Sequence, residues 1–203
     1  MAAPINTPLT EADPYAMNHG SSAYRVDRYE LDLDVRLGSN KLIGKAVLHC
    51  TALEPSARIV LDLVGLRASK VLLDGKKVPK FSQRAEHLVL TPASALKPGQ
   101  QFSLEIRYDG NPQPRRGLWG EVGWEELNDG VLVAGQPNGA ASWFPCNDDP
   151  RYKSSFLISV TTDDNYRPVC NGKLVARSRK SSRETWVYEQ VEPMATYLAT
   201  VQI

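Results

Sequence analysis

The stretch Tyr29-Glu30-Leu31-Asp32-Leu33-Asp34-Val35-Arg36-Leu37 alternates strictly between apolar and charged side chains. Successive side chains of a β-strand point to opposite faces of a sheet, so this period of two gathers the apolar residues on one face. The pattern predicts a strand with one buried and one exposed face. Gly38-Ser39-Asn40 then reads as a turn, and residues 41–53 as the antiparallel partner, with Gly44 as a candidate bulge.

Similar short apolar runs continue along the chain, separated by turn residues. Strands are predicted at 58–63, 69–73, 78–81, 87–90, 101–108, 131–133, 155–161, 166–170, 173–178, 184–189 and 195–203. Asp74-Gly75 and Asn171-Gly172 carry the signature of hairpin turns. Helical spacing of apolar residues is nearly absent. We therefore expect an all-β fold, a saddle-shaped, mostly antiparallel β-sandwich or set of curved sheets.

Two long loops are predicted inside this fold, at 109–129 and 135–152, because both stretches are rich in glycine and proline. Long loops in compact domains are commonly functional or cover a core. Residues 1–22, which contain three prolines and few apolar side chains, are interpreted as an extended N-terminal arm. The β domain is expected over 23–203.

Charge and cysteine content restrict the function classes. The 203 residues contain 24 Lys and Arg against 23 Asp and Glu, a net charge of +1. Nucleic acid or a membrane surface as the main partner would favour a basic excess, so neither is expected. No apolar run could span a membrane and no secretory signal is present, which leads to a cytoplasmic expectation.

The three cysteines, Cys50, Cys146 and Cys170, form no CxxC pair. We interpret them as buried reduced thiols. The sequence leaves open a Cys50–Cys170 or a Cys146–Cys170 disulfide.

A search for chemistry finds no complete active site, so no catalytic residue and no metal ligand is assigned. None of the three histidines, His19, His49 and His87, is followed by Glu or accompanied by a second His within one helical turn. Three adjacent carboxylate pairs are interpreted as turn or capping groups: Glu125-Glu126, Asp148-Asp149 and Asp163-Asp164. The basic run from Arg177 to Arg183 is interpreted as a solvated hairpin tip.

The most unusual segment is 136–156. It begins with a Pro-Asn-Gly turn, continues with the aromatic pair Trp143-Phe144, and ends in an acidic turn between Pro145 and Pro150. From the residues alone it reads as a well-packed loop whose Asp side chains accept backbone N–H groups.

This segment also resembles a known family. Phe144-Pro145-Cys146-x-Asp148-Asp149-Pro150-x-x-Lys153-x-x-Phe156 is similar to the FPCxDEPxxKAxF signature of the aminopeptidase N family, with Asp149 in place of Glu. These gluzincin zinc aminopeptidases include a bifunctional leukotriene hydrolase. Further similarities follow in the family's order: Tyr29-x-Leu31-x-Leu33 with Leu42-x-Gly44, Tyr108-x-Gly110, Val169-Cys170-Asn171-Gly172, and Pro193-Met194-Ala195-Thr196-Tyr197-Leu198-Ala199. Together they cover roughly residues 24–203.

The resemblance implies the N-terminal, non-catalytic β domain of a zinc metallo-aminopeptidase. A catalytic domain with an HExxH zinc motif would follow residue 203, so the chain is expected to be part of a longer enzyme and inactive by itself. Zinc would belong to that catalytic domain. The implied partners are a peptide substrate and the catalytic domain in cis.

One site residue is implied by position in the family. Gln136, eight residues before Phe144, would help to bind the free amine of the substrate. Pro137, Asn138, Gly139 and Ala140 would form the rest of this cleft loop. A second glutamine that the family often carries is Ala134 here.

Two alternatives belong to other classes. One is a stand-alone β-sandwich module that binds peptide or carbohydrate through Trp119, Trp124 and Trp143 in its loops. The other is a docking domain, for which an exposed apolar patch beside the C-terminal strand would be expected. The same patch would equally mark the missing catalytic domain.

Overall fold

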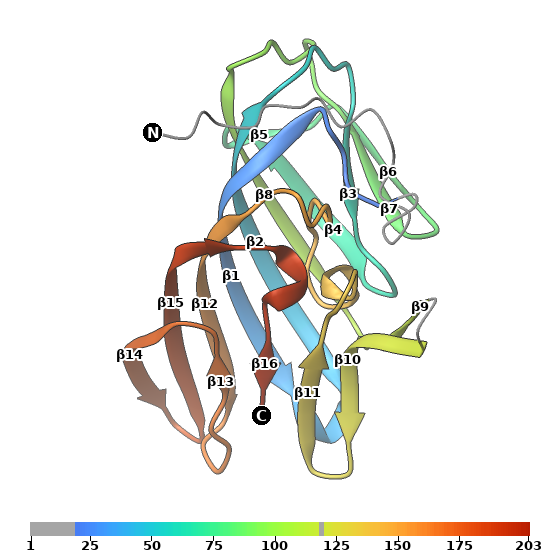
Figure 1. Cartoon of the computed structure of the whole chain (residues 1–203). Coiled ribbons are helices and arrows are strands. Elements are labelled where there is room, and N and C mark those ends of the chain that lie inside the picture. The colour runs from blue at the N-terminus through green and yellow to red at the C-terminus, as the bar shows by residue number, and fades with distance from the viewer. Residues whose placement is uncertain (1–18, 118–119) are drawn as a thin grey trace, which may run out of the picture.

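The computed structural model describes residues 19–117 and 120–203 and arranges their strands in three sheets of eight, five and three strands. Figure 1 shows the eight-stranded sheet as a long, twisted surface behind the five-stranded sheet, with the three-stranded sheet at one end. The described residues contain no α-helix and only three short 3-10 turns. The all-β prediction is therefore confirmed.

About half of the neighbouring strand pairs join strands that are not consecutive in the chain. In spatial order, the eight-stranded sheet is β14 (Lys173–Lys180), β15 (Arg183–Met194), β12 (Ser154–Asp163), β1 (Tyr24–Arg36), β2 (Lys41–Ala52), β8 (Gln101–Gly110), β4 (Arg67–Leu73) and β5 (Lys76–Lys77). The five-stranded sheet is β13 (Val169–Cys170), β16 (Val201–Gln202), β11 (Gly130–Ala134), β10 (Gly120–Leu127) and β9 (Arg115–Gly117). The three-stranded sheet is β3 (Ile59–Asp62), β7 (His87–Thr91) and β6 (Lys80–Arg84). The 3-10 turns are η1 (Leu37–Ser39), η2 (Ala140–Ser142) and η3 (Thr196–Leu198).

The alternating stretch forms the centre of the large sheet. Strand β1 pairs antiparallel with β2 and parallel with β12, and the other strand pairs of the described chain are antiparallel. Tyr29, Leu31, Leu33 and Val35 are at most 2% exposed. Their face therefore forms one wall of the core, as the period of two predicts.

Gly44 is not at a bulge, contrary to the sequence-based interpretation. It keeps regular register with Leu33 and Tyr108, and the β1–β2 irregularity lies between Val26 and Arg28. A Cβ atom at Gly44 would lie 2.2 Å from Cζ of Tyr108. The glycine is needed because the Tyr108 ring occupies the space of its side chain.

The predicted loop 109–129 is partly wrong, because β9 and β10 lie within it. The glycines that suggested a loop permit close backbone approach inside β10. A Cβ atom at Gly123 would lie 2.7 Å from the carbonyl oxygen of Gly139.

Two other local predictions are wrong because the chain changes sheets. Asn171-Gly172 does not close a hairpin, since β13 pairs with β16 and β14 pairs with β15. Residues 195–203 are not one strand: η3 interrupts them, and only Val201–Gln202 form β16. The turn at Asp74-Gly75 is confirmed, because it joins β4 to β5. The segment 78–81, however, does not continue this hairpin and instead leads into β6 of the three-stranded sheet.

The three cysteines and the end of the N-terminal arm are both held by the body of the fold. Cys50, Cys146 and Cys170 are free and buried, so neither open disulfide forms. Burial raises the pKa of all three thiols, which keeps them protonated and unreactive. Most of the predicted arm lies outside the described residues. Its last part is attached to the body, where the Gly20 amide donates to Asp62 Oδ2 at 2.9 Å.

Candidate functional site

The connection between β11 and β12 begins with a compact turn. The Gly139 amide donates to the Gly135 carbonyl at 2.6 Å, which closes residues 135–139. A Cβ atom at Gly135 would lie 2.7 Å from the Tyr197 carbonyl oxygen, and one at Gly139 would lie 2.6 Å from the Gly123 amide nitrogen. The turn is therefore held between η3 and β10, with backbone packed against backbone.

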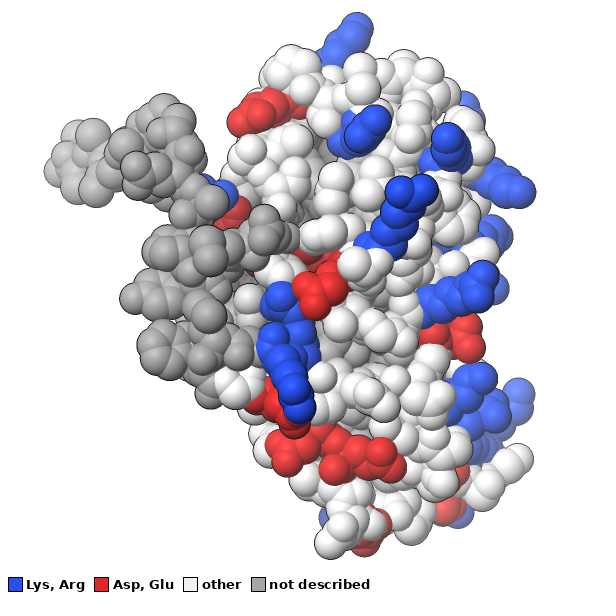
Figure 2. Space-filling model, turned by 90° about the vertical axis from the view of Figure 1, so that its right-hand side faces the viewer, with Lys and Arg blue, Asp and Glu red and all other residues white. Residues whose placement is uncertain are grey.

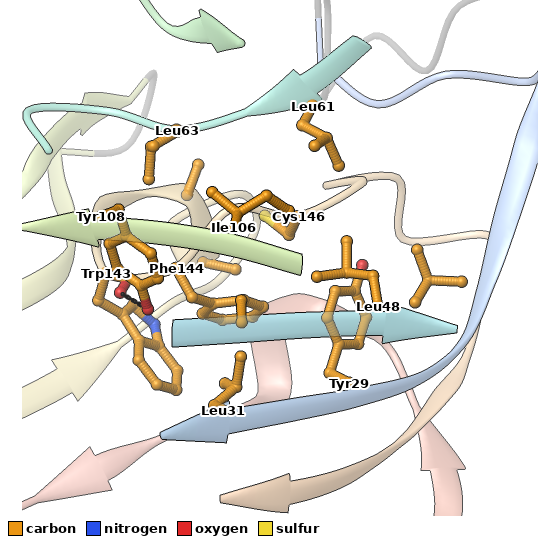
Figure 3. Close-up of a cluster of buried hydrophobic side chains, with 14 of the residues drawn as sticks. Tyr29, Leu31, Leu48, Leu61, Leu63, Ile106, Tyr108, Trp143, Phe144 and Cys146 are labelled. Atoms are coloured by element: carbon orange, nitrogen blue, oxygen red, sulfur yellow. Dashed lines mark hydrogen bonds between the residues drawn. The ribbon is translucent and has the colours of Figure 1, made fainter. Parts of the chain in front are cut away.

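Two aromatic residues anchor the chain after this turn. Trp143 and Phe144 are fully buried and pack edge to face, with ring centroids 4.5 Å apart. Phe144 packs in the same way against Tyr29 of β1. The Tyr108 hydroxyl donates to the Trp143 carbonyl at 3.1 Å, a contact visible in Figure 3. The Leu42-x-Gly44 and Tyr108-x-Gly110 motifs thus act together: Gly44 makes room for the Tyr108 ring, and the Tyr108 hydroxyl holds the loop at Trp143.

The acidic turn that follows is joined to other elements by its backbone and side chains. Cys146 and Asp62 exchange two backbone hydrogen bonds, which ties the turn to β3. The Asn147 amide group donates to the Ser21 and Tyr24 carbonyls and accepts from the Ser21 amide. The expected packed loop is present, and its side chains connect parts of the chain that are distant in sequence.

Asp148 is a buried acid at the centre of these contacts. It is 1% exposed, and its Oδ1 accepts from the Thr196 hydroxyl at 2.7 Å. Its Oδ2 has no hydrogen-bond partner among the described residues. Burial, together with the charge of Asp62, raises the pKa of Asp148 from 3.8 to about 7, and the Thr196 bond opposes this shift. The residue is placed to hold η3 against the acidic turn.

A second polar cluster surrounds Asp62, which sequence reasoning did not single out. Its Oδ2 accepts from the Gly20 and Asp148 amides, and its Oδ1 lies 3.3 Å from His19 Nδ1 and 3.2 Å from His87 Nδ1. Arg115 contacts the His19 ring. These residues come from separate elements, so no local pattern could have grouped them. Through Asp62, these contacts join the start of the described chain at His19 and Gly20 to the acidic turn at Asp148.

Gln136 is the exposed residue of the turn 135–139 that opens this connection. Its side chain is exposed and that of Pro137 is half-buried, whereas every residue from 138 to 149 is buried. The Gln136–Pro137 peptide bond is cis. Among the cleft residues implied by the resemblance, Asn138, Gly139 and Ala140 therefore support the turn from beneath, and Gln136 is the side chain free to reach outward.

The carbohydrate-binding and peptide-clamping alternative loses its main support. Trp124 and Trp143 are fully buried, so neither ring can stack on a ligand. Trp124 instead donates its indole N–H to Asn40 at 3.0 Å. Trp119, the third candidate, lies outside the described residues.

The polar clusters of the described chain do not form a metal site. Within residues 19–117 and 120–203, no group of three or more His, Cys, Asp or Glu side chains is placed to hold a metal ion. The His19, Asp62 and His87 contacts are accordingly interpreted as a structural cluster.

The fold and the loop together define an all-β domain that presents one exposed polar residue on a rigid turn. The chain belongs to the Peptidase M1 N-terminal domain family, whose profile matches residues 25–198. The predicted family is thereby confirmed.

Curated relatives are aminopeptidases. The chain is 26% identical over 178 residues to a leucyl aminopeptidase of Saccharolobus solfataricus. The aligned region covers 86% of this chain and 21% of that protein. It is 28% identical over 132 residues to aminopeptidase Q of Homo sapiens, covering 61% of this chain and 13% of that protein. The chain thus spans about a fifth or less of the length of these relatives.

Solved structures give the same family. The M1 zinc metallopeptidase of Deinococcus radiodurans superposes with a TM-score of 0.86 at 29% identity, covering 91% of this chain and 43% of that one. A mutant of an M1 zinc metallopeptidase from that organism, bound to a Tyr-Ser-Ala substrate, superposes equally well, with a TM-score of 0.86.

Proposed function

We propose that this chain is the non-catalytic N-terminal domain of a zinc-dependent aminopeptidase and forms one wall of its active-site cleft. Membership of the family, the aminopeptidase relatives and the small share of their length that the chain covers support this proposal. The catalytic domain acts in cis and hydrolyses the first peptide bond of a peptide substrate. Zinc would be held by that catalytic domain, where it would supply Lewis-acid chemistry for activating water.

Gln136 is the residue of this chain that contacts the substrate in the proposal. Its exposure on a turn that leads into the buried residues 138–149 is the observation that carries it. The amide oxygen of glutamine accepts hydrogen bonds, and a free peptide N-terminus is an ammonium group that donates them. A rigid turn holds such an acceptor in place, so little conformational entropy is lost on binding.

A face for the catalytic domain is available beside the last strand. Val169 is 53% exposed and pairs with Gln202 of β16, and Leu198 of the neighbouring η3 is 49% exposed. Asn171, which follows β13 directly, joins β13 to η3 by donating its side-chain N–H to the Leu198 carbonyl. These exposed apolar side chains fit the apolar patch expected beside the C-terminal strand.

The proposed location is the cytoplasm. The three free, buried thiols are consistent with a reducing compartment. The described residues contain no helix long and apolar enough to cross a membrane.

The Gln136→Ala variant of the complete enzyme tests the substrate role. Loss of a hydrogen bond to a charged group weakens binding by roughly 10–100-fold. We expect KM for a dipeptide to rise by that factor. Substrates that lack the α-amino group should be affected far less. Steady-state kinetics on both substrate types measure the difference.

Gln113→Ala, a change of the same kind at another exposed glutamine, is the matched control and should leave KM unchanged. An unaltered KM in Gln136→Ala would remove the substrate role. Separately, zinc-dependent hydrolysis of an aminoacyl-anilide by the 203-residue chain alone would contradict the non-catalytic assignment.

A further inference from the structure

Six cationic side chains lie on neighbouring edges of two sheets. We define the basic edge as the following residues of β4, β5 and β6: Arg67, Lys70, Lys76, Lys77, Lys80 and Arg84. All six are exposed. Strand β5 is the last strand of the eight-stranded sheet and β6 the last of the three-stranded sheet, so the basic edge has no strand beyond it among the described residues.

The charge of the molecule is unevenly distributed. Residues 67–84 contain six of the 24 Lys and Arg residues but one of the 23 Asp and Glu residues, which leaves 18 cations and 22 anions elsewhere. The net charge of +1 for the whole chain is thus the sum of +5 for residues 67–84 and −4 for all other residues. In Figure 2 most Lys and Arg side chains lie in the upper and right-hand parts of this face, and the largest group of Asp and Glu lies at the lower left.

These cations are not neutralised within the described chain. None of the six forms an ion pair with a described carboxylate, whereas nearby Lys41 and Arg107 pair with Asp109 and Glu105. The one acid of the segment, Asp74, is engaged by Ser103, whose amide and hydroxyl both donate to its Oδ1. The positive potential of the basic edge is therefore available to an external anion.

The basic edge is held as one rigid surface. The Gln83 side chain accepts from the Ala68 amide at 3.0 Å and donates to the Leu66 carbonyl at 2.5 Å, which clamps β6 to β4. Val78, between β5 and β6, is buried and its amide donates to Val71. The backbone that carries these cations is consequently held in place and loses little freedom when a partner binds.

The chemistry of the surface discriminates between anionic partners. Single-stranded nucleic acid is normally bound by exposed aromatic platforms, and the only aromatic residue of the segment, Phe81, is half-buried. None of the large exposed hydrophobic residues of the described chain lies within 67–84, so nothing there would insert into a bilayer core. An exposed edge of lysine and arginine without apolar anchors suits a broad, negatively charged surface that is contacted from outside.

We propose that the basic edge binds the headgroups of anionic phospholipids at a bilayer surface, and so places the protein reversibly on a membrane. The near-zero net charge of the sequence argued against a membrane surface as partner. It did so because a net charge does not reveal that positive charge is concentrated in residues 67–84. The basic edge lies in the upper half of Figure 1, away from the C-terminus. The proposal does not depend on the proposed peptidase role.

The test is vesicle co-sedimentation of the 203-residue chain. Vesicles of phosphatidylcholine with about a third phosphatidylserine are compared with pure phosphatidylcholine at low and moderate salt. Each lysine near such a surface adds about fivefold to partitioning. We expect binding to the anionic vesicles alone, decreasing as salt is raised, and a decrease of about 25-fold or more in Lys76→Glu/Lys77→Glu.

Lys173→Glu/Lys180→Glu on β14 is the matched control, because it changes the charge by the same amount at another exposed strand. It should retain most of the binding, and circular dichroism should show all three proteins folded. Equal losses in both variants, or equal binding to neutral vesicles, would overturn the proposal. So would tighter binding to a single-stranded RNA or to polyglutamate than to the anionic vesicles.

Discussion

The connection 138–149 and strand β14 show opposite relations between regularity and burial. The connection contains only one short 3-10 turn, yet all of its residues are buried. Residues 173–180 form the eight-residue strand β14, hydrogen-bonded along its length to β15 with one register shift, yet all of its residues are exposed. Regular secondary structure therefore does not indicate which part of this molecule supports the rest.

The difference follows from how each segment satisfies its polar groups. A buried irregular backbone is tolerable only when its N–H and C=O groups find partners. In the connection, the Tyr108 hydroxyl and the Asp62 backbone supply them. An edge strand such as β14 needs only one neighbour and leaves its other side to water.

The largest expected effect is the loss of the aromatic anchor in the connection. Phe144→Ala removes a fully buried ring that packs against Trp143 and Tyr29, so we expect the free energy of unfolding to fall by about 3–5 kcal/mol. Denaturant unfolding followed by circular dichroism measures it. If this variant does not fold, Phe144→Leu should show a smaller loss in the same direction. A loss below about 1 kcal/mol in Phe144→Ala would mean that the connection is not integral to the core.

The next effect concerns the buried acid of the connection and depends on pH. Because burial raises the pKa of Asp148 from 3.8 to about 7, the folded state holds its proton more tightly than the unfolded state. Its contribution to stability is therefore present below pH 4 and is lost as pH rises through about 7. One pKa unit corresponds to about 1.4 kcal/mol, so the change is on the order of 4 kcal/mol.

Asp148→Asn removes this titration while its amide oxygen can still accept from Thr196. We expect the stability difference, variant minus wild type, to increase from pH 4 to pH 7 and to level off at higher pH. Urea denaturation at a series of pH values measures this difference. A difference that does not vary with pH would show that Asp148 does not titrate in this range.

The smallest effect is expected in β14. Leu174 is 40% exposed, so Leu174→Ala should change the free energy of unfolding by no more than about 0.5 kcal/mol. The same unfolding experiment as for Phe144→Ala applies. A loss comparable to that of the phenylalanine variant would show that β14 is covered in solution, for instance by a second copy of the chain.

Much of the strand structure could be predicted from local sequence. The alternation from Tyr29 to Arg36, the turn at Asp74-Gly75 and the hairpin tip near Ser181 are all determined by neighbouring residues, and each is present as expected. The motifs around Phe144 also identified the family before any contact was known. Local patterns succeed there because strand faces and tight turns depend on residues close together in the chain.

Predictions that depended on distant partners were less reliable. The glycines of 109–129 suggested a loop, but Gly123 allows β10 to lie against Gly139. Asn171-Gly172 suggested a hairpin, but the strands on either side pair in different sheets. Glycine and asparagine are compatible both with a turn and with close packing inside a sheet. The segment that packs against them, which is distant in sequence, decides between the two.

The sequence by itself determined the all-β class, the buried face of β1 and the family, because periodicity and motif spacing are properties of the chain. The tertiary structure alone decided which side chains meet. It leaves Gln136 exposed above a buried turn, brings Asp62 to Asp148 and the N-terminal segment, and gathers six cations on one edge. The physical reason is that burial, pKa and surface potential depend on distances through space, which folding sets between residues far apart in sequence.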